Sequence, residues 1–259
     1  MAGALSDGRS AVPAWAWPLV ALRLTGLLAL LLLCVPLYYA LAPFTRRNPA
    51  PRLFLRGVAA IAGVRLRTRG TLSSRRSFIV TNHVSWIDIP ALAGTTGTAF
   101  VAHDGLAQIG PLRWLCALND TVFVARHERR SVAAQVAQVR QALGESGTLT
   151  IFAEGTTSDG SGTLPFKSSL LSALEGEAQS VAVQPVWLDY GSDARRIAWV
   201  GDEPGLDNAL RILARPGGVD LTIHFLPPLE AHERADRKVM ATAARAAIDG
   251  AIARLRSHA

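Results

Sequence analysis

The sequence predicts an α/β fold: a single domain with a mixed, mostly buried central sheet flanked by helices, preceded by an N-terminal membrane-attachment helix. Three observations predict it. Residues 24–43 form a nearly unbroken apolar run. From residue 65 onward, short apolar segments of strand length alternate with helical segments, which is typical of a sheet covered on both faces. The 259 residues are 49% hydrophobic and 18% charged, which provides a large core and excludes intrinsic disorder.

The apolar run at residues 24–43 is long enough to cross a bilayer, because about 1.5 Å per residue gives a span of roughly 30 Å. Trp15 and Trp17 precede the run, and Tyr38 and Tyr39 close it. Aromatic residues are enriched at these positions, where a helix meets the membrane–water interface. We therefore expect membrane attachment through this segment.

Two alternatives for the apolar run remain open. Residues 40–42 resemble a small-residue signal cleavage site. Arg46 and Arg47 follow directly, and positive charge after a span favours an uncleaved segment whose C-terminal side faces the cytoplasm. Pro36 interrupts the run and Arg23 stands just before it, so a hairpin or a shallow anchor that never crosses is also possible.

The basic charge is concentrated near this run. Between Asp7 and Asp88 the sequence has no acidic residue but eleven arginines, within a formal net charge of +7. Such a stretch attracts polyanions, and its place beside an apolar segment favours anionic lipid over nucleic acid. Residues 51–64 predict an amphipathic helix that contacts the membrane. The predicted division is a membrane segment at 1–50, this helix at 51–64 and a catalytic domain at 65–259.

The elements of the domain follow in order along the chain. Buried-type strands are predicted at 77–81, 98–102, 121–125, 149–152 and 181–188. Helices are predicted at 129–143 and 168–175, and the chain ends with late strands at 197–200 and 221–225 and a closing helix at 235–255.

The first chemical motif follows the strand at 77–81. His83 and Asp88 stand five positions apart across a strand-to-helix turn, at the sheet edge where α/β proteins bind ligands. A carboxylate bonded to one imidazole nitrogen fixes the tautomer and leaves the other as a base. Ser85 is too near His83 to be a convincing nucleophile, and no G-x-S-x-G elbow is present. The pair therefore favours direct transfer, in which the base deprotonates an acceptor hydroxyl.

Three later strands also end in groups suited to a binding site. Arg126 follows the strand at 121–125, and arginine suits bidentate anion binding. Glu154 and Gly155 follow the strand at 149–152. Pro185 interrupts a buried strand, which indicates a shaped pocket wall. The alternatives are a solvated ion pair between Glu154 and Arg126, and a simple bulge at the proline.

Together these four segments resemble the four sequence blocks of the glycerolipid acyltransferases, whose best-known members are the 1-acylglycerol-3-phosphate acyltransferases. The resemblance implies that His83 is the base and that Asp88 orients it. It implies an acceptor site built from a further set of residues: Arg126, Glu154, Gly155, Thr156 and Lys167. Asn82, Ser85 and Pro185 are expected to line the pocket. No metal and no redox cofactor is expected, and acyl-CoA or acyl-carrier protein serves as co-substrate.

The chain departs from the family's third block, which usually reads Phe-Pro-Glu-Gly-Thr-Arg-Ser. Ala153 replaces the proline, Thr157 replaces the arginine, and His103 stands where a lysine is frequent. Lys167 matches a lysine often seen downstream. Two cations that would contact an acceptor phosphate are therefore missing or weakened, which leaves the acceptor open.

The resulting hypothesis is a membrane-bound O-acyltransferase on the cytoplasmic side of an inner or plasma membrane. It would convert 1-acyl-sn-glycerol-3-phosphate to phosphatidic acid in phospholipid biosynthesis, with membrane lipids and the acyl donor as partners. The first alternative is a lyso-ornithine lipid O-acyltransferase, whose acceptor has no phosphate. Less favoured are an acyl thioesterase, which would direct the same pair at water, and an inactive lipid-binding or scaffold protein. Nucleic acid is not expected as a partner, because no base-stacking platform accompanies the arginines.

Overall fold

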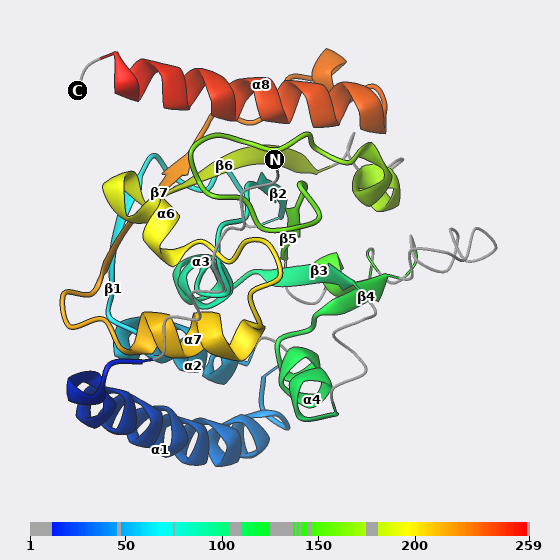
Figure 1. The fold of residues 1–259 in the computed structure, drawn as a ribbon. Helices are drawn as coiled ribbons and strands as arrows, with labels where there is room; N and C mark the ends of the chain where they lie inside the picture. The colour runs from blue at the N-terminus through cyan, green and yellow to red at the C-terminus, as the bar shows by residue number, and fades with distance from the viewer. Residues whose placement is uncertain are drawn as a thin grey trace.

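The computed structural model describes residues 12–45, 48–74, 76–103, 110–124, 137, 139, 141–144, 147–174 and 181–257. Within them, seven strands form one sheet in the order β1-β7-β6-β2-β5-β3-β4 (Figure 1). The strands are β1 (Val64–Arg69), β2 (Ser77–Thr81), β3 (Ala99–His103), β4 (Val122–Val124), β5 (Thr148–Phe152), β6 (Ala182–Asp189) and β7 (Val219–Phe225). Only the β6–β7 pair within this sheet is antiparallel. The mixed sheet of the predicted α/β fold is confirmed.

Helices cover both faces of the sheet. The α-helices within the described ranges are α1 (Trp17–Leu41), α2 (Ala50–Ile61), α3 (Asp88–Thr96), α4 (Gly110–Leu118), α6 (Ala194–Ile197), α7 (Gly205–Leu213) and α8 (Arg237–Arg256). Short 3₁₀ segments are η1 (Ala14–Ala16), η4 (Ser168–Leu174), η5 (Gly191–Asp193) and η6 (His232–Arg234). In Figure 1, α8 lies on one side of the sheet and α2, α3 and α7 lie on the other.

The alternation of side chains along β2 divides the core into two layers. Ile79 packs in the cluster that contains α2, α3 and α7. Its neighbours Phe78 and Val80 pack in the cluster that contains α8. Successive strand residues point to opposite faces, so a strand buried on both faces must be apolar on both. This explains the continuous apolar runs by which the sequence predicted the strands.

The strand order places three carboxyl ends at one edge of the sheet. β2 pairs in parallel with β5 on one side and with β6 on the other. The segments that follow these strands therefore start next to each other, although they are far apart in the sequence. They begin at Asn82, Ala153 and Tyr190.

Several predicted elements need correction or comment. Residues 197–200 do not form a strand: α6 ends at Ile197, and the following residues join no ladder of the sheet. Residues 168–174 form a 3₁₀ segment, and the helix predicted at 129–143 lies largely outside the described residues. β1, α4 and α7 were not anticipated. β1 is an exposed edge strand with the sequence VRLRTR, in which Val64 and Leu66 alternate with arginines, and two apolar residues are too few to mark a buried strand.

α1 is the helix of the described chain that is long and apolar enough to cross a membrane, judged by length and composition. It packs against α2 and touches α7 (Figure 1). Arg23 donates a hydrogen bond of 2.8 Å to the carbonyl oxygen of Leu213 at the C-terminal end of α7. Leu22, Leu28 and Leu32 are more than half exposed on the opposite side. One side of α1 therefore packs against the domain, and the other side exposes apolar side chains.

Candidate active site

The centre of the site is a histidine–aspartate pair at the end of β2. β2 ends at Thr81, the chain turns through residues 82–87, and Asp88 opens α3. This turn brings Nδ1 of His83 to 2.7 Å from Oδ2 of Asp88. The Asp88 side chain is fully buried, whereas 16% of the His83 side chain is exposed. The imidazole therefore lies at the surface of the domain with a buried carboxylate behind it.

Asp88 accepts four hydrogen bonds. Besides the imidazole, Oδ2 accepts the backbone N–H groups of Val84 at 2.7 Å and Ser85 at 3.0 Å. Oδ1 accepts the hydroxyl of Tyr190, which follows β6. Backbone N–H groups can only donate, so Oδ2 acts as an acceptor toward them and toward the imidazole. The neutral imidazole therefore carries its proton on Nδ1, and Nε2 is the nitrogen without a hydrogen.

Aromatic stacking sets the plane of the imidazole. The His83 ring stacks on Phe152 with centroids 3.9 Å apart and planes 20° apart. Phe152 in turn stacks on Phe100 with centroids 5.7 Å apart. Phe152 is the last residue of β5 and Phe100 is the second residue of β3, so the sheet itself orients the imidazole.

Glu154 lies beside the pair, but its carboxylate is turned toward the backbone. One oxygen accepts the N–H of His83 at 3.0 Å, and the other accepts the N–H of Leu164 at 2.8 Å. The residue is 1% exposed. Burial raises the pKa of the Glu154 carboxyl, with the two N–H donors and the Ser158 hydroxyl opposing this effect. Glu154 thus holds the histidine backbone and the returning loop in place.

The loops that carry the two carboxylates are tied to each other. Ser158 donates from its N–H and its hydroxyl to the carbonyl oxygen of His83, at 2.7 and 3.1 Å. Trp199 donates its N–H to the carbonyl of Val84 at 2.9 Å and accepts the hydroxyl of Thr157. The segment after α6 therefore joins both loops into one unit.

Comparison with known proteins decides the family. The Acyltransferase family model matches residues 63–189, from the start of β1 to the end of β6. A protein of Rhodobacter capsulatus named lyso-ornithine lipid O-acyltransferase is 33% identical over 251 residues, covering 93% of this chain and 89% of that protein. The chain belongs to the acyltransferase family.

Other relatives agree with this assignment. A lyso-ornithine lipid O-acyltransferase of Brucella abortus is 32% identical, covering 85% of this chain and 88% of that protein. A 1-acyl-sn-glycerol-3-phosphate acyltransferase of Neisseria meningitidis is 29% identical, covering 61% and 62%. The acyltransferase also shares its fold with the crystal structure of the 1-acyl-sn-glycerophosphate (LPA) acyltransferase PlsC of Thermotoga maritima. That match has a TM-score of 0.58 at 18% identity and covers 87% of this chain and 95% of that one.

The pocket residues expected from the sequence are buried supports of this acyltransferase. The amide of Asn82 donates to the carbonyl of Leu188 at 3.1 Å and accepts its N–H at 2.8 Å, so it joins β2 to β6. The Ser85 hydroxyl donates to Asn208 at 3.2 Å. Pro185 is buried in β6, and its carbonyl accepts the N–H of Leu226 at 3.1 Å, just beyond β7.

Those expected acceptor residues that the structure describes lie around the same edge of the sheet as the His83–Asp88 pair. Gly155 has a φ of 66°, a left-handed conformation that favours glycine, and it turns the chain directly after Glu154. Thr156 is exposed. Lys167 is also exposed, and its backbone N–H donates to the carbonyl of Ala153 at 2.8 Å, which brings it back to the end of β5. Arg126 lies outside the described residues.

Two groups in contact with the pair were missed from the sequence: Tyr190 and Ser158. Tyr190 stands two positions after the predicted strand at 181–188, as His83 and Glu154 do after theirs, so the strand-end rule that found those residues would also have found it. Ser158 occupies the serine position that ends the family's third block, so the resemblance is the signal that could have found it.

Proposed function

We propose that this acyltransferase moves a fatty acyl group from a thioester, acyl-CoA or acyl-carrier protein, to the free hydroxyl of lyso-ornithine lipid. The observation that carries the reaction is the His83–Asp88 pair, whose Nε2 remains available as a base at a partly exposed position. The relatives named above and the neutral residue at position 157 support the acceptor.

The transfer proceeds through one tetrahedral intermediate. Nε2 of His83 takes the proton from the acceptor hydroxyl as its oxygen attacks the thioester carbonyl carbon. Asp88 stabilises the imidazolium that forms, because its carboxylate is 2.7 Å from Nδ1. The intermediate then collapses, the carbon–sulfur bond breaks, and the imidazolium returns the proton to the departing thiolate. The products are an ester and a free thiol, and no acyl-enzyme forms.

The sequence favoured lysophosphatidic acid over lyso-ornithine lipid as the acceptor, and the present proposal reverses that order. Lysophosphatidic acid carries a phosphomonoester, which calls for cations beside the acceptor site. Thr157 replaces the family's arginine, and its hydroxyl is already bonded to the carbonyl of Trp199. Position 157 therefore supplies neither a positive charge nor a free donor. The relatives named for lyso-ornithine lipid also cover more of this chain than the Neisseria relative does.

Lysophosphatidic acid remains a second candidate for a specific reason. Lys167 is exposed at the same sheet edge as the pair, and Arg126 follows β4 in the sequence. Two cations of this kind suit a phosphomonoester.

Acyl transfer to both acceptors in parallel distinguishes the candidates. Purified full-length protein is given an acyl thioester with lyso-ornithine lipid or lysophosphatidic acid, and ester formation is followed for each. The proposal expects a clear preference for lyso-ornithine lipid. Efficient transfer to lysophosphatidic acid with none to lyso-ornithine lipid would overturn the acceptor assignment.

A pair of variants at position 157 sharpens this test. Thr157→Arg removes the bond to Trp199 and adds a cation, whereas Thr157→Val removes the bond alone. We expect Thr157→Arg, relative to Thr157→Val, to increase transfer to lysophosphatidic acid against lyso-ornithine lipid. An unchanged ratio between the two acceptors would show that position 157 does not face the head group.

We further propose that the outward face of α1 lies in lipid, at an inner or plasma membrane with the domain on the cytoplasmic side. The exposed leucines of α1 and the arginines that surround it in the sequence support this arrangement. Protease added to intact spheroplasts should leave the domain uncut, and lysis should expose it. Cleavage in intact spheroplasts would contradict the orientation.

A further inference from the structure

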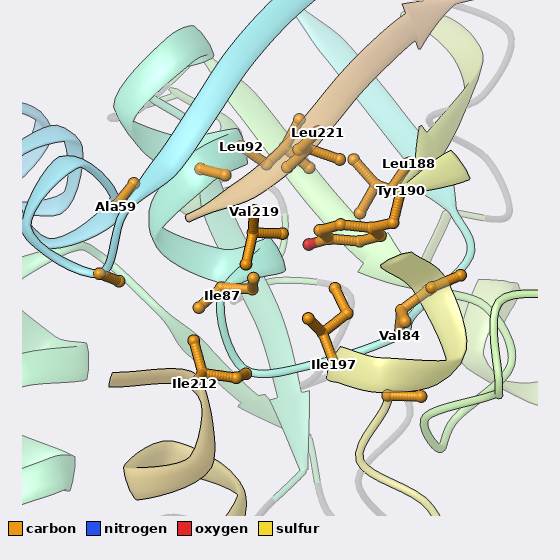
Figure 2. Packing of buried hydrophobic residues seen from close by; sticks show 14 of the residues in the cluster. Ala59, Val84, Ile87, Leu92, Leu188, Tyr190, Ile197, Ile212, Val219 and Leu221 are labelled. Carbon is orange, nitrogen blue, oxygen red and sulfur yellow. The ribbon is translucent and has the colours of Figure 1, made fainter. Parts of the chain in front are cut away.

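Tyr190 lies directly after β6 and contacts the histidine–aspartate pair from a second strand. Its hydroxyl donates to Oδ1 of Asp88, and the residue is 3% exposed. Figure 2 shows its ring beside Leu188 and Ile197, with the hydroxyl oxygen directed into the cluster toward Val219. No part of the reaction described above uses this hydroxyl.

The partners of Asp88 indicate what the hydroxyl does. Oδ2 accepts three of the four hydrogen bonds: the imidazole of His83 and the N–H groups of Val84 and Ser85. Oδ1 faces the apolar cluster, and Tyr190 supplies its hydrogen bond. The carboxylate is fully buried, so an unpaired Oδ1 would carry charge into an apolar environment without compensation.

This arrangement fixes the carboxylate from two directions. The turn after β2 holds Oδ2, and the end of β6 holds Oδ1. Rotation of the carboxylate about its Cβ–Cγ bond would break the contacts of both oxygens. The oxygen that faces His83 is therefore selected partly by Tyr190, which lies 102 positions from Asp88 in the sequence.

The hydroxyl stays protonated at any working pH. Complete burial raises the pKa of Tyr190 well above its ordinary value, and the charge of Asp88 and the hydrogen bond to it add to the shift. Among the described residues, the other titratable groups in contact with this unit are His83 and, through the N–H of His83, Glu154. Tyr190 is thus a permanent donor.

We propose that Tyr190 is a positioning residue for acyl transfer: its hydroxyl holds Asp88 in the orientation that receives the Nδ1–H of His83. The inference rests on the proposed transfer reaction but not on which lyso-lipid is the acceptor. It assigns to Tyr190 an effect on the chemical step rather than on substrate binding.

The first test is Tyr190→Phe, which removes the hydroxyl and keeps the ring. We expect kcat to fall about 10-fold, as a small misplacement of a catalytic group would cause, with KM nearly unchanged. The acid limb of the pH–rate profile should move to higher pH, because a carboxylate with one donor fewer makes the pair hold its proton more tightly. Tyr39→Phe is the matched control, since it also removes one tyrosine hydroxyl, from a side chain that is exposed on α1 and whose partner is Trp114. An unchanged kcat and pH profile for Tyr190→Phe would overturn the proposal.

A double-mutant cycle separates positioning from a general effect on packing. If Tyr190 acts through Asp88, Tyr190→Phe should cost almost nothing further in an Asp88→Asn background. A full additional loss in that background would overturn the proposal. The acceptor is whichever lyso-lipid the wild type uses, so failure of the wild type on lyso-ornithine lipid counts against the acceptor assignment and not against Tyr190.

A second measurement remains decisive if Tyr190→Phe folds poorly. The chain has three tyrosines. Replacing Tyr38 and Tyr39 by Phe and growing cells on 3-fluorotyrosine therefore labels Tyr190 alone. Fluorine makes the phenol a stronger donor, so the acid limb should move to lower pH, opposite to the shift in Tyr190→Phe. No shift, or a shift to higher pH, would overturn the proposal.

Discussion

Asp88 and Glu154 are two buried carboxylates at the ends of neighbouring strands, yet their partners differ. Asp88 follows β2 and accepts an imidazole, a phenol and two backbone N–H groups. Glu154 follows β5 and accepts the N–H groups of His83 and Leu164, with the Ser158 hydroxyl beside it. One carboxylate contacts the imidazole of His83, and the other contacts the backbone that carries it.

The difference predicts separate roles: Asp88 acts in the reaction, and Glu154 supports the backbone of the site. Changing Asp88 alters the tautomer and orientation of the imidazole, so the rate of transfer should respond most. Changing Glu154 alters the position of the backbone, so stability should respond most and the rate should follow indirectly. The resemblance implies that Asp88 orients the histidine and that Glu154 belongs to the acceptor site, whereas the hydrogen bonds of Glu154 go to the backbone of His83 and Leu164.

The largest expected effect is that of Asp88→Asn on kcat. By analogy with the aspartate of a serine–histidine–aspartate triad, we expect a loss on the order of 10,000-fold, because an amide admits the wrong imidazole tautomer. Steady-state kinetics on a variant with a cooperative unfolding transition provides the measurement. If the kcat of Asp88→Asn were within a few-fold of wild type, the proposed difference in role between Asp88 and Glu154 would be contradicted.

Glu154→Gln should show the reverse balance. The Gln amide presents a donor to one of the two backbone N–H groups, which leaves that group unpaired at a cost of about 1–3 kcal/mol. For a chain of this length each kcal/mol corresponds to about 2–4 °C in Tm. We expect kcat to fall far less than in Asp88→Asn. Calorimetry with parallel kinetics checks both, and a large rate loss at unchanged Tm would assign Glu154 to the chemistry instead.

The pH dependence of stability offers a smaller test of the same residue. Burial raises the folded-state pKa of Glu154 above its ordinary value of 4.5. Its contribution to stability is therefore complete below that value and is lost as pH rises through the folded-state pKa. The free energy of unfolding of wild type minus that of Glu154→Gln should decrease as pH rises from 4 toward 7. Urea titrations at several pH values measure this difference, and an increase with pH would contradict the assignment.

The smallest effect concerns the contact that joins the two loops. Thr157→Val removes the hydrogen bond to the carbonyl of Trp199 and should cost about 0.5–1.5 kcal/mol. Thr156→Val at the adjacent exposed position is the matched control and should cost less. Equal urea midpoints for the two variants would show that the Thr157 contact contributes little.

Much of the fold could be predicted because strands buried on both faces must be apolar, as in β2 and β6. Strand ends also indicated where His83, Asp88 and Glu154 would meet. β1 was not predicted because it is short, exposed and rich in arginine, and because its first residue, Val64, was assigned to the preceding helix. Residues 197–200 were predicted as a strand because of their apolar composition, but Ile197 ends α6 and Trp199 is hydrogen-bonded to both loops.

The details of the site depended on the path of the chain in space. Whether Glu154 faces a substrate or a backbone N–H is decided by how its loop returns at Leu164. The place of Tyr190 just after a predicted strand could have been recognised in the sequence, but its contact with Asp88 depends on the β2–β6 pairing.

The most direct test of the account follows thiol release and ester formation in the same sample, for wild type and for His83→Ala. Direct transfer by the His83–Asp88 pair predicts that wild type releases thiol only when the lyso-lipid is present, in a 1:1 ratio to ester. It predicts that His83→Ala loses both activities by about 100- to 10,000-fold. Thiol release without acceptor, or ester formation at near wild-type rate in a folded His83→Ala protein, would contradict the account.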